Sequence, residues 1–286
     1  MHQSVNAERG LSEHSRSLQS VLAAVQMASG PHVEANLAEA GRRIGEAAAA
    51  GAELVALPEN FAIMGYRDTD KLREAEVDGE GPIQAFLAEQ ARHHRVTLVG
   101  GTIPLRAEDP ERVRPAALVF GPDGRRLAGY DKIHLFDVEV SPGEAYRESA
   151  TQQAGAEPLV VETPVGRLGI AVCYDLRFPE LFRALVERGA EILVVPSAFT
   201  AVTGQAHWNI LVRARAVENL CYTVAPDQGG YHVNGRETHG ESMIVDPWGR
   251  VLASQAHGAG VVTASVSLAR LRQIRERFPA LLHRKL

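Results

Sequence analysis

The chain has 286 residues, of which 45% are hydrophobic and 23% are charged, and its formal net charge is −5. This composition is typical of an enzyme-sized globular protein, and it lacks the basic stripe that nucleic-acid binding requires. No apolar stretch reaches the roughly 18 residues of a membrane span. We therefore expect no nucleic-acid partner and no membrane partner.

The N-terminal segment lacks the apolar stretch of a secretory signal. We expect a cytoplasmic protein with a disordered or loosely docked leader over residues 1–19 and a single domain over residues 20–286. The chain has two cysteines, Cys173 and Cys221, and neither belongs to a C-x-x-C or Cys/His ligand pattern. A disulfide framework and a structural zinc site are therefore not predicted.

Strand and helix patterns alternate in the first half of the chain. Residues 20–27 predict a strand, residues 35–50 a helix with one apolar face, and residues 53–57 a second strand. Alternation of this kind predicts parallel strands that are connected by helical crossovers.

The second half repeats this plan. Residues 169–173, 179–188 and 192–195 predict a strand, a helix and a strand. Two pairs of segments also match in sequence, namely residues 51–59 with 189–197, and the predicted hairpins 120–128 and 245–253. The matches predict an α/β fold in which two mixed sheets pack face to face with helices outside, a four-layer sandwich with internal pseudo-two-fold symmetry.

Three apolar segments are each followed by a reactive side chain, which is Glu59, Lys132 or Cys173. Together these groups are sufficient for acyl transfer. A free thiol has a pKa of about 8.5 and needs a base, and Glu59 can supply this base if partial burial raises its pKa toward neutrality. Lys132 and the backbone N–H of Tyr174 can stabilise the tetrahedral oxyanion.

Each of these residues also has an inert interpretation. A lone cysteine is usually a buried small hydrophobe, Glu59 could cap a helix or loop, and Lys132 could be a solvated loop charge. The polar residues that follow Cys173, and the place of all three after predicted strands, favour the catalytic interpretation.

The segments that carry these residues resemble the three signature segments of the nitrilase superfamily of carbon–nitrogen hydrolases. They read LPEN at 57–60, YDKIHLFD at 130–137 and GIAVCYDLRFPE at 169–180. The resemblance extends from Ser20 to the C-terminus. It implies an α-β-β-α sandwich, Glu–Lys–Cys catalysis without a metal or organic cofactor, a small-molecule amide and water as substrates, and a homodimer.

The same resemblance points to a second glutamate. The segment YRES at 146–149 is similar to the one that supplies this residue in the family, so Glu148 would keep Lys132 charged and oriented while it hydrogen-bonds to substrate or water. The alternative is that Glu148 is a surface charge beside Arg147.

Within the superfamily, the chain resembles the branch of deaminated glutathione amidases and ω-amidases. Residues 196–199 and 228–230 favour the deaminated glutathione amidases. The implied reaction cleaves a small carboxylate-bearing amide through a cysteine thioester, with release of ammonia. The alternatives are an ω-amidase that acts on α-keto acid amides, a carbamoylase or nitrilase, and a non-catalytic binding protein on the same scaffold.

Substrates of this branch carry a carboxylate, for which a guanidinium is the expected partner. Arg177 is the candidate closest to Cys173 in the sequence, although it could instead form a structural pair with Glu180 or Asp175. Phe199 and Thr203 resemble pocket-lining positions, and Tyr174 is the other candidate substrate contact.

Motifs of other enzyme classes are absent from the sequence. It contains no G-x-S-x-G elbow, no P-loop, no G-x-G-x-x-G after a strand and no H-E-x-x-H. A serine hydrolase, a nucleotide enzyme and a zinc hydrolase are therefore not expected.

Overall fold

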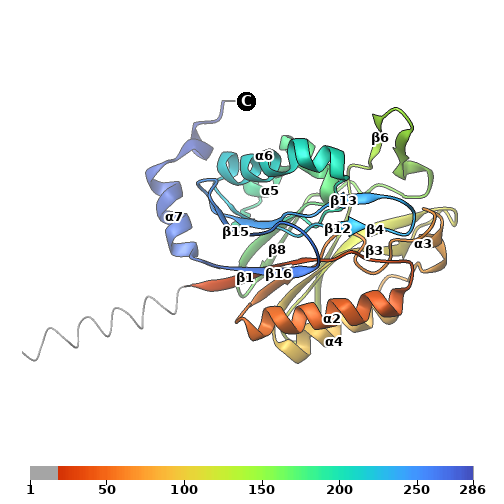
Figure 1. Ribbon diagram of the computed structural model, residues 1–286. Coiled ribbons are helices and arrows are strands. Elements are labelled where there is room, and N and C mark those ends of the chain that lie inside the picture. Colours follow the sequence, from red (N-terminus) through yellow and green to blue (C-terminus); the bar gives the residue numbers. More distant parts are fainter. Residues whose placement is uncertain (1–18, 286) are drawn as a thin grey trace, which may run out of the picture.

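The computed structural model describes residues 19–285, and the predicted leader lies outside these residues except for Gln19. Two six-stranded sheets form the centre of the fold (Figure 1). In spatial order, the first sheet consists of β16 (Gly260–Val266), β1 (Ser20–Gln26), β2 (Leu54–Ala56), β3 (Thr97–Arg106), β4 (Val113–Phe120) and β5 (Arg126–Asp131). The second consists of β8 (Leu159–Thr163), β9 (Gly166–Ile170), β10 (Ile192–Val194), β11 (Tyr222–Ala225), β14 (Ser242–Val245) and β15 (Val251–Gln255).

The two sheets have matching topologies. In each, three neighbouring strands run parallel, β1-β2-β3 in the first sheet and β9-β10-β11 in the second. Two antiparallel strands follow on one side, and an antiparallel edge strand, β16 or β8, lies on the other. The predicted mixed sheets and internal pseudo-symmetry are confirmed.

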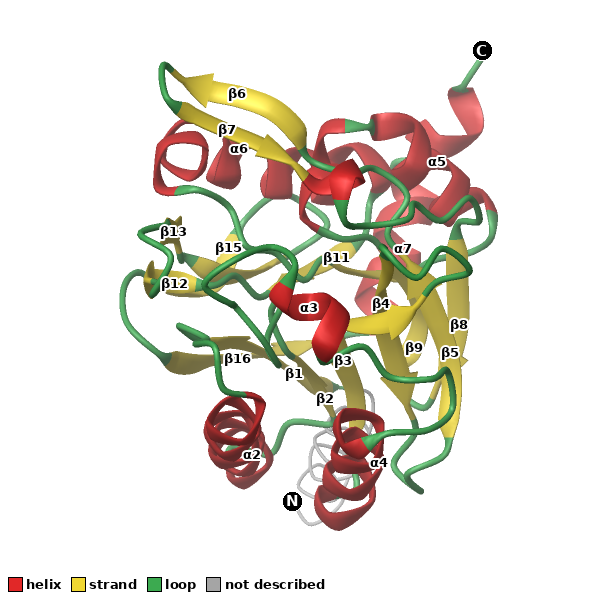
Figure 2. Ribbon diagram, turned by 90° about the vertical axis from the view of Figure 1, so that its right-hand side faces the viewer, coloured by secondary structure: helices red, strands yellow, loops and turns green. Residues whose placement is uncertain are grey.

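Helices cover the outer face of each sheet. Figure 2 shows α2 (Val33–Ala49) and α4 (Pro82–His94) against the first sheet, with α5 (Pro179–Glu187) and α6 (Ala201–Asn219) on the opposite side of the molecule. The remaining helices are α3 (Asp70–Arg73), α7 (Leu268–Arg277) and the 3-10 helices Glu148–Ala150, Cys173–Arg177 and Ala280–His283. The four layers are those of an α-β-β-α sandwich. No helix within residues 19–285 is both long and apolar enough to cross a bilayer.

Strand β1 shows why the sequence of a central strand is a continuous apolar run. Leu22 and Ala24 belong to the core between the sheets, whereas Ala23 and Val25 pack with Ile44 of α2 in a second core. Successive side chains of a strand point to opposite faces, so a strand between two layers is apolar on both.

Two small hairpins extend from the sandwich and lie near the same end of it. They are formed by β6 (Asp137–Ser141) with β7 (Glu144–Arg147), and by β12 (Gly229–Tyr231) with β13 (Glu237–His239). The first connects the Lys132 segment to Glu148, and the second follows β11 of the parallel core. Both hairpins therefore belong to connections at the end of the sandwich where the reactive residues were predicted.

Candidate active site

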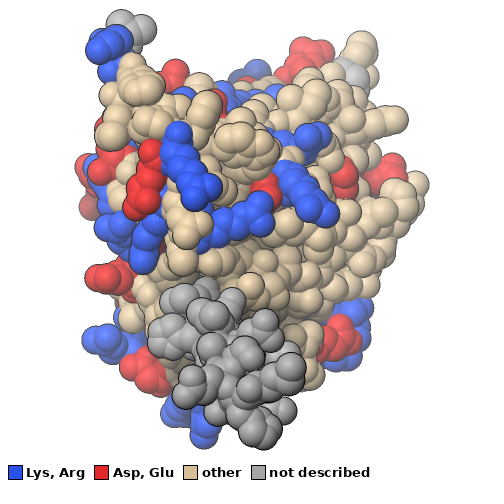
Figure 3. All heavy atoms as spheres, turned by 90° about the vertical axis from the view of Figure 1, so that its left-hand side faces the viewer, with Lys and Arg blue, Asp and Glu red and all other residues tan. Residues whose placement is uncertain are grey.

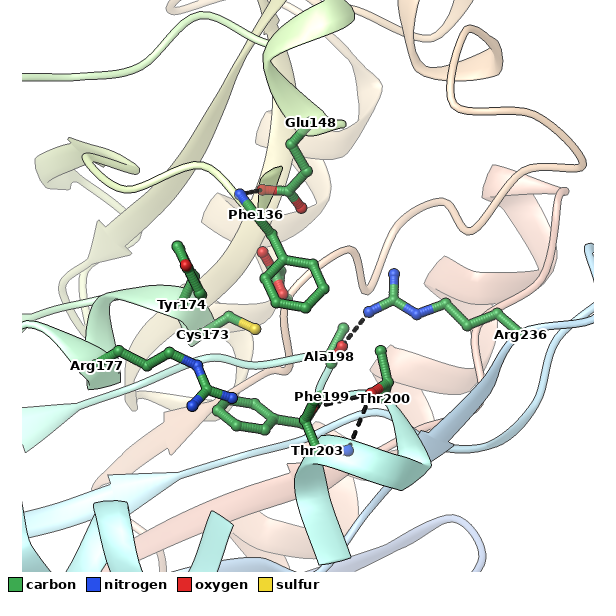
Figure 4. Close-up of a pocket in the computed structure, with 11 residues that line it drawn as sticks. Phe136, Glu148, Cys173, Tyr174, Arg177, Ala198, Phe199, Thr200, Thr203 and Arg236 are labelled. Atoms are coloured by element: carbon green, nitrogen blue, oxygen red, sulfur yellow. Dashed lines mark hydrogen bonds between the residues drawn. The ribbon is translucent and has the colours of Figure 1, made fainter. Parts of the chain in front are cut away.

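The three reactive side chains predicted from the sequence meet at one end of the sandwich. Glu59 follows β2, Lys132 follows β5, and Cys173 follows β9. Lys132 Nζ lies 2.8 Å from Glu59 Oε1, and Glu59 and Cys173 line the same pocket (Figure 4). This inner pocket is lined by Glu59, Phe136, Glu148, Cys173, Tyr174, Arg177, Ala198, Phe199, Thr200, Thr203 and Arg236.

Cys173 follows strand β9 and lies at the start of a 3-10 helix. Strand β9 ends at Ile170, before the expected boundary at 173, but the backbone N–H groups of Ala171 and Cys173 still donate to the carbonyls of Val194 and Pro196. Cys173 then begins the 3-10 helix Cys173–Arg177 with a φ of 47°, in the left-handed region that non-glycine residues rarely adopt. The extended chain thus delivers the thiol to the end of the sheet, and a strained residue turns it into the pocket.

The turn after Cys173 is held by the buried carboxylate of Asp175. Its Oδ2 accepts hydrogen bonds from the Val172 N–H at 2.8 Å and the Tyr130 hydroxyl at 2.7 Å. Its Oδ1 lies 2.6 Å from Nδ1 of His134 and accepts the His134 backbone N–H at 3.1 Å. Because Tyr130 and His134 flank Lys132, Asp175 fixes the lysine segment to the cysteine segment. The sequence analysis considered Asp175 as a possible partner of Arg177 and not as a link to the lysine segment.

Glu59 is positioned by its own tight turn. Asn60 follows with a φ of 58°, and its N–H donates to the Thr102 side chain. Nε2 of the buried Gln228 donates to the Glu59 carbonyl at 3.0 Å. Gly101 allows β3 to approach, because a Cβ there would lie 1.9 Å from the Pro58 carbonyl oxygen. The backbone at Glu59 is therefore held from both halves of the fold.

Lys132 binds two carboxylates that line the pocket. Its ammonium is completely buried and lies 2.8 Å from both Glu59 Oε1 and Glu148 Oε2. Burial alone would lower the pKa of Lys132, but the negative charges of Glu148 and Glu59 outweigh it and raise this pKa well above the ordinary value. The lysine is thus a permanent cation.

Glu148 is not a surface charge. Besides Lys132, its Oε2 accepts the backbone N–H of Phe136 at 2.8 Å. Burial opposes ionisation of Glu148, but the nearby Lys132 and Lys71 ammonium groups keep its pKa below the ordinary value. Glu148 is therefore an ionised carboxylate in the pocket wall.

The thiol of Cys173 is protonated at neutral pH. Burial and the neighbouring Glu59 carboxylate raise its pKa well above the usual value, and the opposing effect of Lys132 is smaller. A nucleophile in this state needs a base at the moment of attack. Cys221 is also buried, and desolvation raises its pKa to about 11, but it does not line the pocket.

All four predicted substrate-contacting residues line the pocket, namely Tyr174, Arg177, Phe199 and Thr203. The Arg177 guanidinium lies over the rings of Tyr174 and Phe199, with its carbon 5.9 and 5.7 Å from their centroids. Its two Nη atoms lie 3.3 Å from Nδ1 of His207. The alternative interpretation was that Arg177 forms a structural ion pair with Glu180 or Asp175. Within residues 19–285, neither ion pair is present.

Thr203 is placed by the start of α6. The hydroxyl of Thr200 accepts the Thr203 backbone N–H at 3.2 Å and lies 2.9 Å from the Thr203 hydroxyl. Phe199 is held by Asp227, whose Oδ1 accepts the Phe199 N–H at 2.9 Å. Burial raises the pKa of Asp227 well above its ordinary value.

The sequence analysis did not predict Arg236. This residue lies in the loop between β12 and β13 and reaches the pocket from the side opposite to Arg177 (Figure 4). No apolar strand precedes it, so no local pattern distinguishes it from other loop arginines. The sequence analysis used Gln228 only as part of residues 228–230, which favoured the deaminated glutathione amidases, and did not predict its contact with Glu59.

Within the described residues, no group of three or more His, Cys, Asp or Glu side chains is arranged to hold a metal ion. The polar centre of the site instead consists of a thiol, an ammonium group and two carboxylates. This set can exchange protons with a substrate and stabilise an oxyanion, which are the requirements of acyl transfer.

Comparisons with known proteins identify the family of this chain. The carbon–nitrogen hydrolase family model matches residues 21–276. A deaminated glutathione amidase of Synechocystis is 45% identical over 265 residues, which cover 92% of this chain and 97% of the relative.

Two solved structures share the fold. The NitFhit protein of Caenorhabditis elegans superposes with a TM-score of 0.87 at 38% identity, covering 93% of this chain and 65% of that one. Nit3 of Saccharomyces cerevisiae, a nitrilase-superfamily member, has a TM-score of 0.84 at 30% identity, covering 94% and 96% of the two chains. This chain therefore belongs to the carbon–nitrogen hydrolase family of the nitrilase superfamily and is an amidase-type hydrolase.

Proposed function

We propose that this hydrolase cleaves a small carboxylate-bearing amide through a thioester on Cys173, and that its preferred substrate is deaminated glutathione. The observation that carries the mechanism is the buried Lys132 ammonium, which binds Glu59 and Glu148 in the pocket that Cys173 lines. The substrate is proposed from the name of the relatives that are similar over most of this chain.

In the first half of the reaction, Glu59 removes the thiol proton as Sγ of Cys173 attacks the amide carbonyl carbon. The oxyanion that forms accepts hydrogen bonds from the Lys132 ammonium and the Tyr174 backbone N–H. Glu59 then gives its proton to the amide nitrogen, the carbon–nitrogen bond breaks, and the amine leaves. The acyl group remains on Cys173 as a thioester.

In the second half, water enters the space that the amine has left. Glu59 takes a proton from this water, and the resulting hydroxide attacks the thioester carbon. Collapse of the second tetrahedral intermediate breaks the carbon–sulfur bond, and the thiolate recovers the proton from Glu59. Glu148 keeps Lys132 oriented in both halves, because the two groups form a buried ion pair.

The identity of the leaving amine depends on the substrate. Deaminated glutathione and α-ketoglutaramate share the acyl group of α-ketoglutarate, so both give the same thioester. Ammonia leaves from the primary amide α-ketoglutaramate, whereas cysteinylglycine leaves when the corresponding amide of deaminated glutathione is cleaved. The predicted release of ammonia therefore applies to the ω-amidase alternative.

Arg177 is proposed to bind the carboxylate of the acyl group. Its guanidinium packs on two aromatic rings, and a substrate carboxylate would take the place of His207 Nδ1 at the two Nη donors, which suit a bidentate contact. Phe199, Thr203 and Tyr174 line the same part of the pocket and would contact the acyl chain.

A substrate panel with the purified full-length protein tests this proposal. The panel contains deaminated glutathione, α-ketoglutaramate, N-carbamoyl amino acids and simple nitriles, and mass spectrometry identifies the products. We expect the highest kcat/KM with deaminated glutathione. If another member of the panel gives a higher kcat/KM, that compound replaces deaminated glutathione as the proposed substrate. If the protein turns over no member, the non-catalytic alternative is favoured.

Intact-protein mass spectrometry after acid quenching tests the nucleophile. An acyl adduct is expected in the wild-type chain and in Cys221→Ser, but not in Cys173→Ala. Adduct that persists in Cys173→Ala would overturn the assignment of the nucleophile.

A homodimer is also proposed. Ile210 and Val217 lie two turns apart on α6 and are 69% and 46% exposed, and such an apolar stripe is typical of an interface. The cytoplasmic location remains a prediction from the sequence.

A further inference from the structure

An outer basin adjoins the inner pocket. It encloses about 560 Å³, whereas the inner pocket encloses about 10 Å³. Four separate segments form its wall, and its lining residues are Tyr66, Arg67, Asp68, Gly143, Glu144, Ala145, Tyr146, Ala201, Val202, Asn234, Gly235, Arg236 and Glu237. The outer basin is therefore the space with room for the bulkier half of a substrate.

Arg236 connects the two spaces, because it lines both of them. Its Nη2 donates to the carbonyl of Ala198, and its guanidinium carbon lies 5.0 Å from the centroid of the Tyr146 ring. Its Nε is buried without a hydrogen-bond partner among the described residues. Within residues 19–285, no carboxylate forms an ion pair with Arg236, whereas Lys132 forms ion pairs with Glu59 and Glu148.

The other charged groups of the basin lie further from the nucleophile. Arg67, Asp68, Glu144 and Glu237 line the outer basin but not the inner pocket. Asp68 and Glu237 are exposed, and Glu144 accepts the Tyr146 hydroxyl at 2.9 Å. Arg236 is therefore the charged side chain of the basin wall that borders the inner pocket, and the guanidinium fork is suited to a carboxylate.

The loop that carries Arg236 is anchored to both halves of the fold. The ring of the buried His232 contacts the Ser29 carbonyl at 2.9 Å and the Thr238 hydroxyl at 2.8 Å. The backbone N–H of His232 donates to the Arg236 carbonyl. A cation on an anchored loop, stacked on an aromatic ring, loses little conformational freedom when it binds an anion.

Arg177 and Arg236 lie on opposite sides of the Cys173 sulfur (Figure 4). An amide bond attacked by this sulfur has an acyl half on one side and an amine half on the other. Because Arg177 is assigned to the acyl carboxylate, Arg236 and the large basin face the amine half.

We propose that Arg236 and the outer basin form a subsite for the leaving amine, and that this amine is a short peptide with a free carboxylate that Arg236 binds. This inference rests on the proposed function and deepens it. Arg236 would then determine substrate preference. It would favour deaminated glutathione, whose leaving amine is anionic, over α-ketoglutaramate, a primary amide with the same acyl group.

The test compares substrates that share the α-ketoglutarate acyl group and differ only in the amine. They are deaminated glutathione, its C-terminal carboxamide and α-ketoglutaramate. In Arg236→Gln we expect kcat/KM for deaminated glutathione to fall roughly ten- to a hundredfold, the effect of losing one charge-assisted contact. Values for the carboxamide and for α-ketoglutaramate should change less than threefold. Arg236→Lys should retain part of the preference, and Arg250→Gln, an exposed arginine outside the site, is the matched control.

Each outcome bears on a different part of the argument. If the wild-type protein hydrolyses none of the three substrates, the proposed function fails. If Arg236→Gln lowers all three values equally, the proposed function stands, and Arg236 is a positioning residue for the Ala198 loop rather than a leaving-group anchor. A loss confined to α-ketoglutaramate would also overturn the proposal.

Discussion

Substitution of Lys132 by methionine tests the centre of the proposed mechanism. Methionine is unbranched and apolar, so Lys132→Met removes the charge from a position that is completely buried. Removing one oxyanion donor typically costs about 10²–10³ in kcat. We expect at least this loss with deaminated glutathione as substrate, because the same ammonium also orients Glu59 and Glu148.

The same change should lower stability. The Glu59 and Glu148 side chains are only 4% and 17% exposed, and each forms an ion pair with Lys132. Removing one partner of a buried ion pair costs about 3–5 kcal/mol, against a typical domain stability of about 5–15 kcal/mol. The variant should therefore fold but unfold at lower urea concentration than the wild type.

The direction of the pH effect follows from Glu148. In the wild type its pKa lies below the unfolded value, so ionisation of this group favours the folded state and the benefit is lost as pH falls. Lys132→Met removes the larger of the two positive charges near Glu148, so we expect burial to raise this pKa relative to the wild type and ionisation to favour folding less. The stability difference between wild type and variant should therefore widen from pH 5 to pH 8.

A double variant separates catalysis from stability. Lys132→Met/Glu148→Gln removes one of the two unpaired carboxylates and should recover part of the lost stability but none of the kcat. Lys285→Met, an exposed lysine, is the control. Near-normal kcat with only a raised KM in Lys132→Met would refute the reasoning and make Lys132 a binding charge.

Three further predictions concern neighbouring features. Arg177→Lys should lower kcat/KM for carboxylate-bearing amides about tenfold or more relative to neutral amides, through loss of the bidentate contact; lower thermal stability with an unchanged substrate ratio would make Arg177 structural. Asp227→Asn keeps an acceptor for the Phe199 N–H but removes a carboxyl whose raised pKa makes the folded state lose stability as pH rises. The free energy of unfolding of this variant in urea should therefore rise relative to that of the wild type from pH 4 to pH 8, and a constant difference would contradict this. Ile210→Asp should shift the protein from dimer to monomer in light scattering, whereas the exposed Val233→Asp should not; an unchanged mass would exclude α6 from the interface.

Much of the fold could be predicted because its signals are local. The parallel units are encoded in alternating apolar segments of strand and helix length, and the matched segments 51–59 and 189–197 both lead into equivalent strands, β2 and β10. The reactive residues were found for the same reason. Glu59, Lys132 and Cys173 each follow an apolar strand, and parallel topology brings strand ends to one edge.

The rest of the site depends on contacts between distant segments. Asp175 acts through Tyr130 and His134, and Gln228 acts through Glu59, and no local spacing encodes these pairs. Arg236 lies in a loop, where side-chain direction is set by the anchoring of the whole hairpin. Such positions become visible only when the chain is folded.

The pairing of β1 with β16 has a consequence for protein synthesis. Ser20 pairs with Val266 and Gln26 with Gly260, so β1, the first strand of the described residues, takes its outer partner from β16, the last one. Until β16 has been synthesised, β1 is an open, apolar edge, which is a template for pairing with other nascent chains. Loss of β16 by premature termination should therefore produce aggregation rather than a shorter active enzyme, and the distance between these partners along the chain favours slow folding.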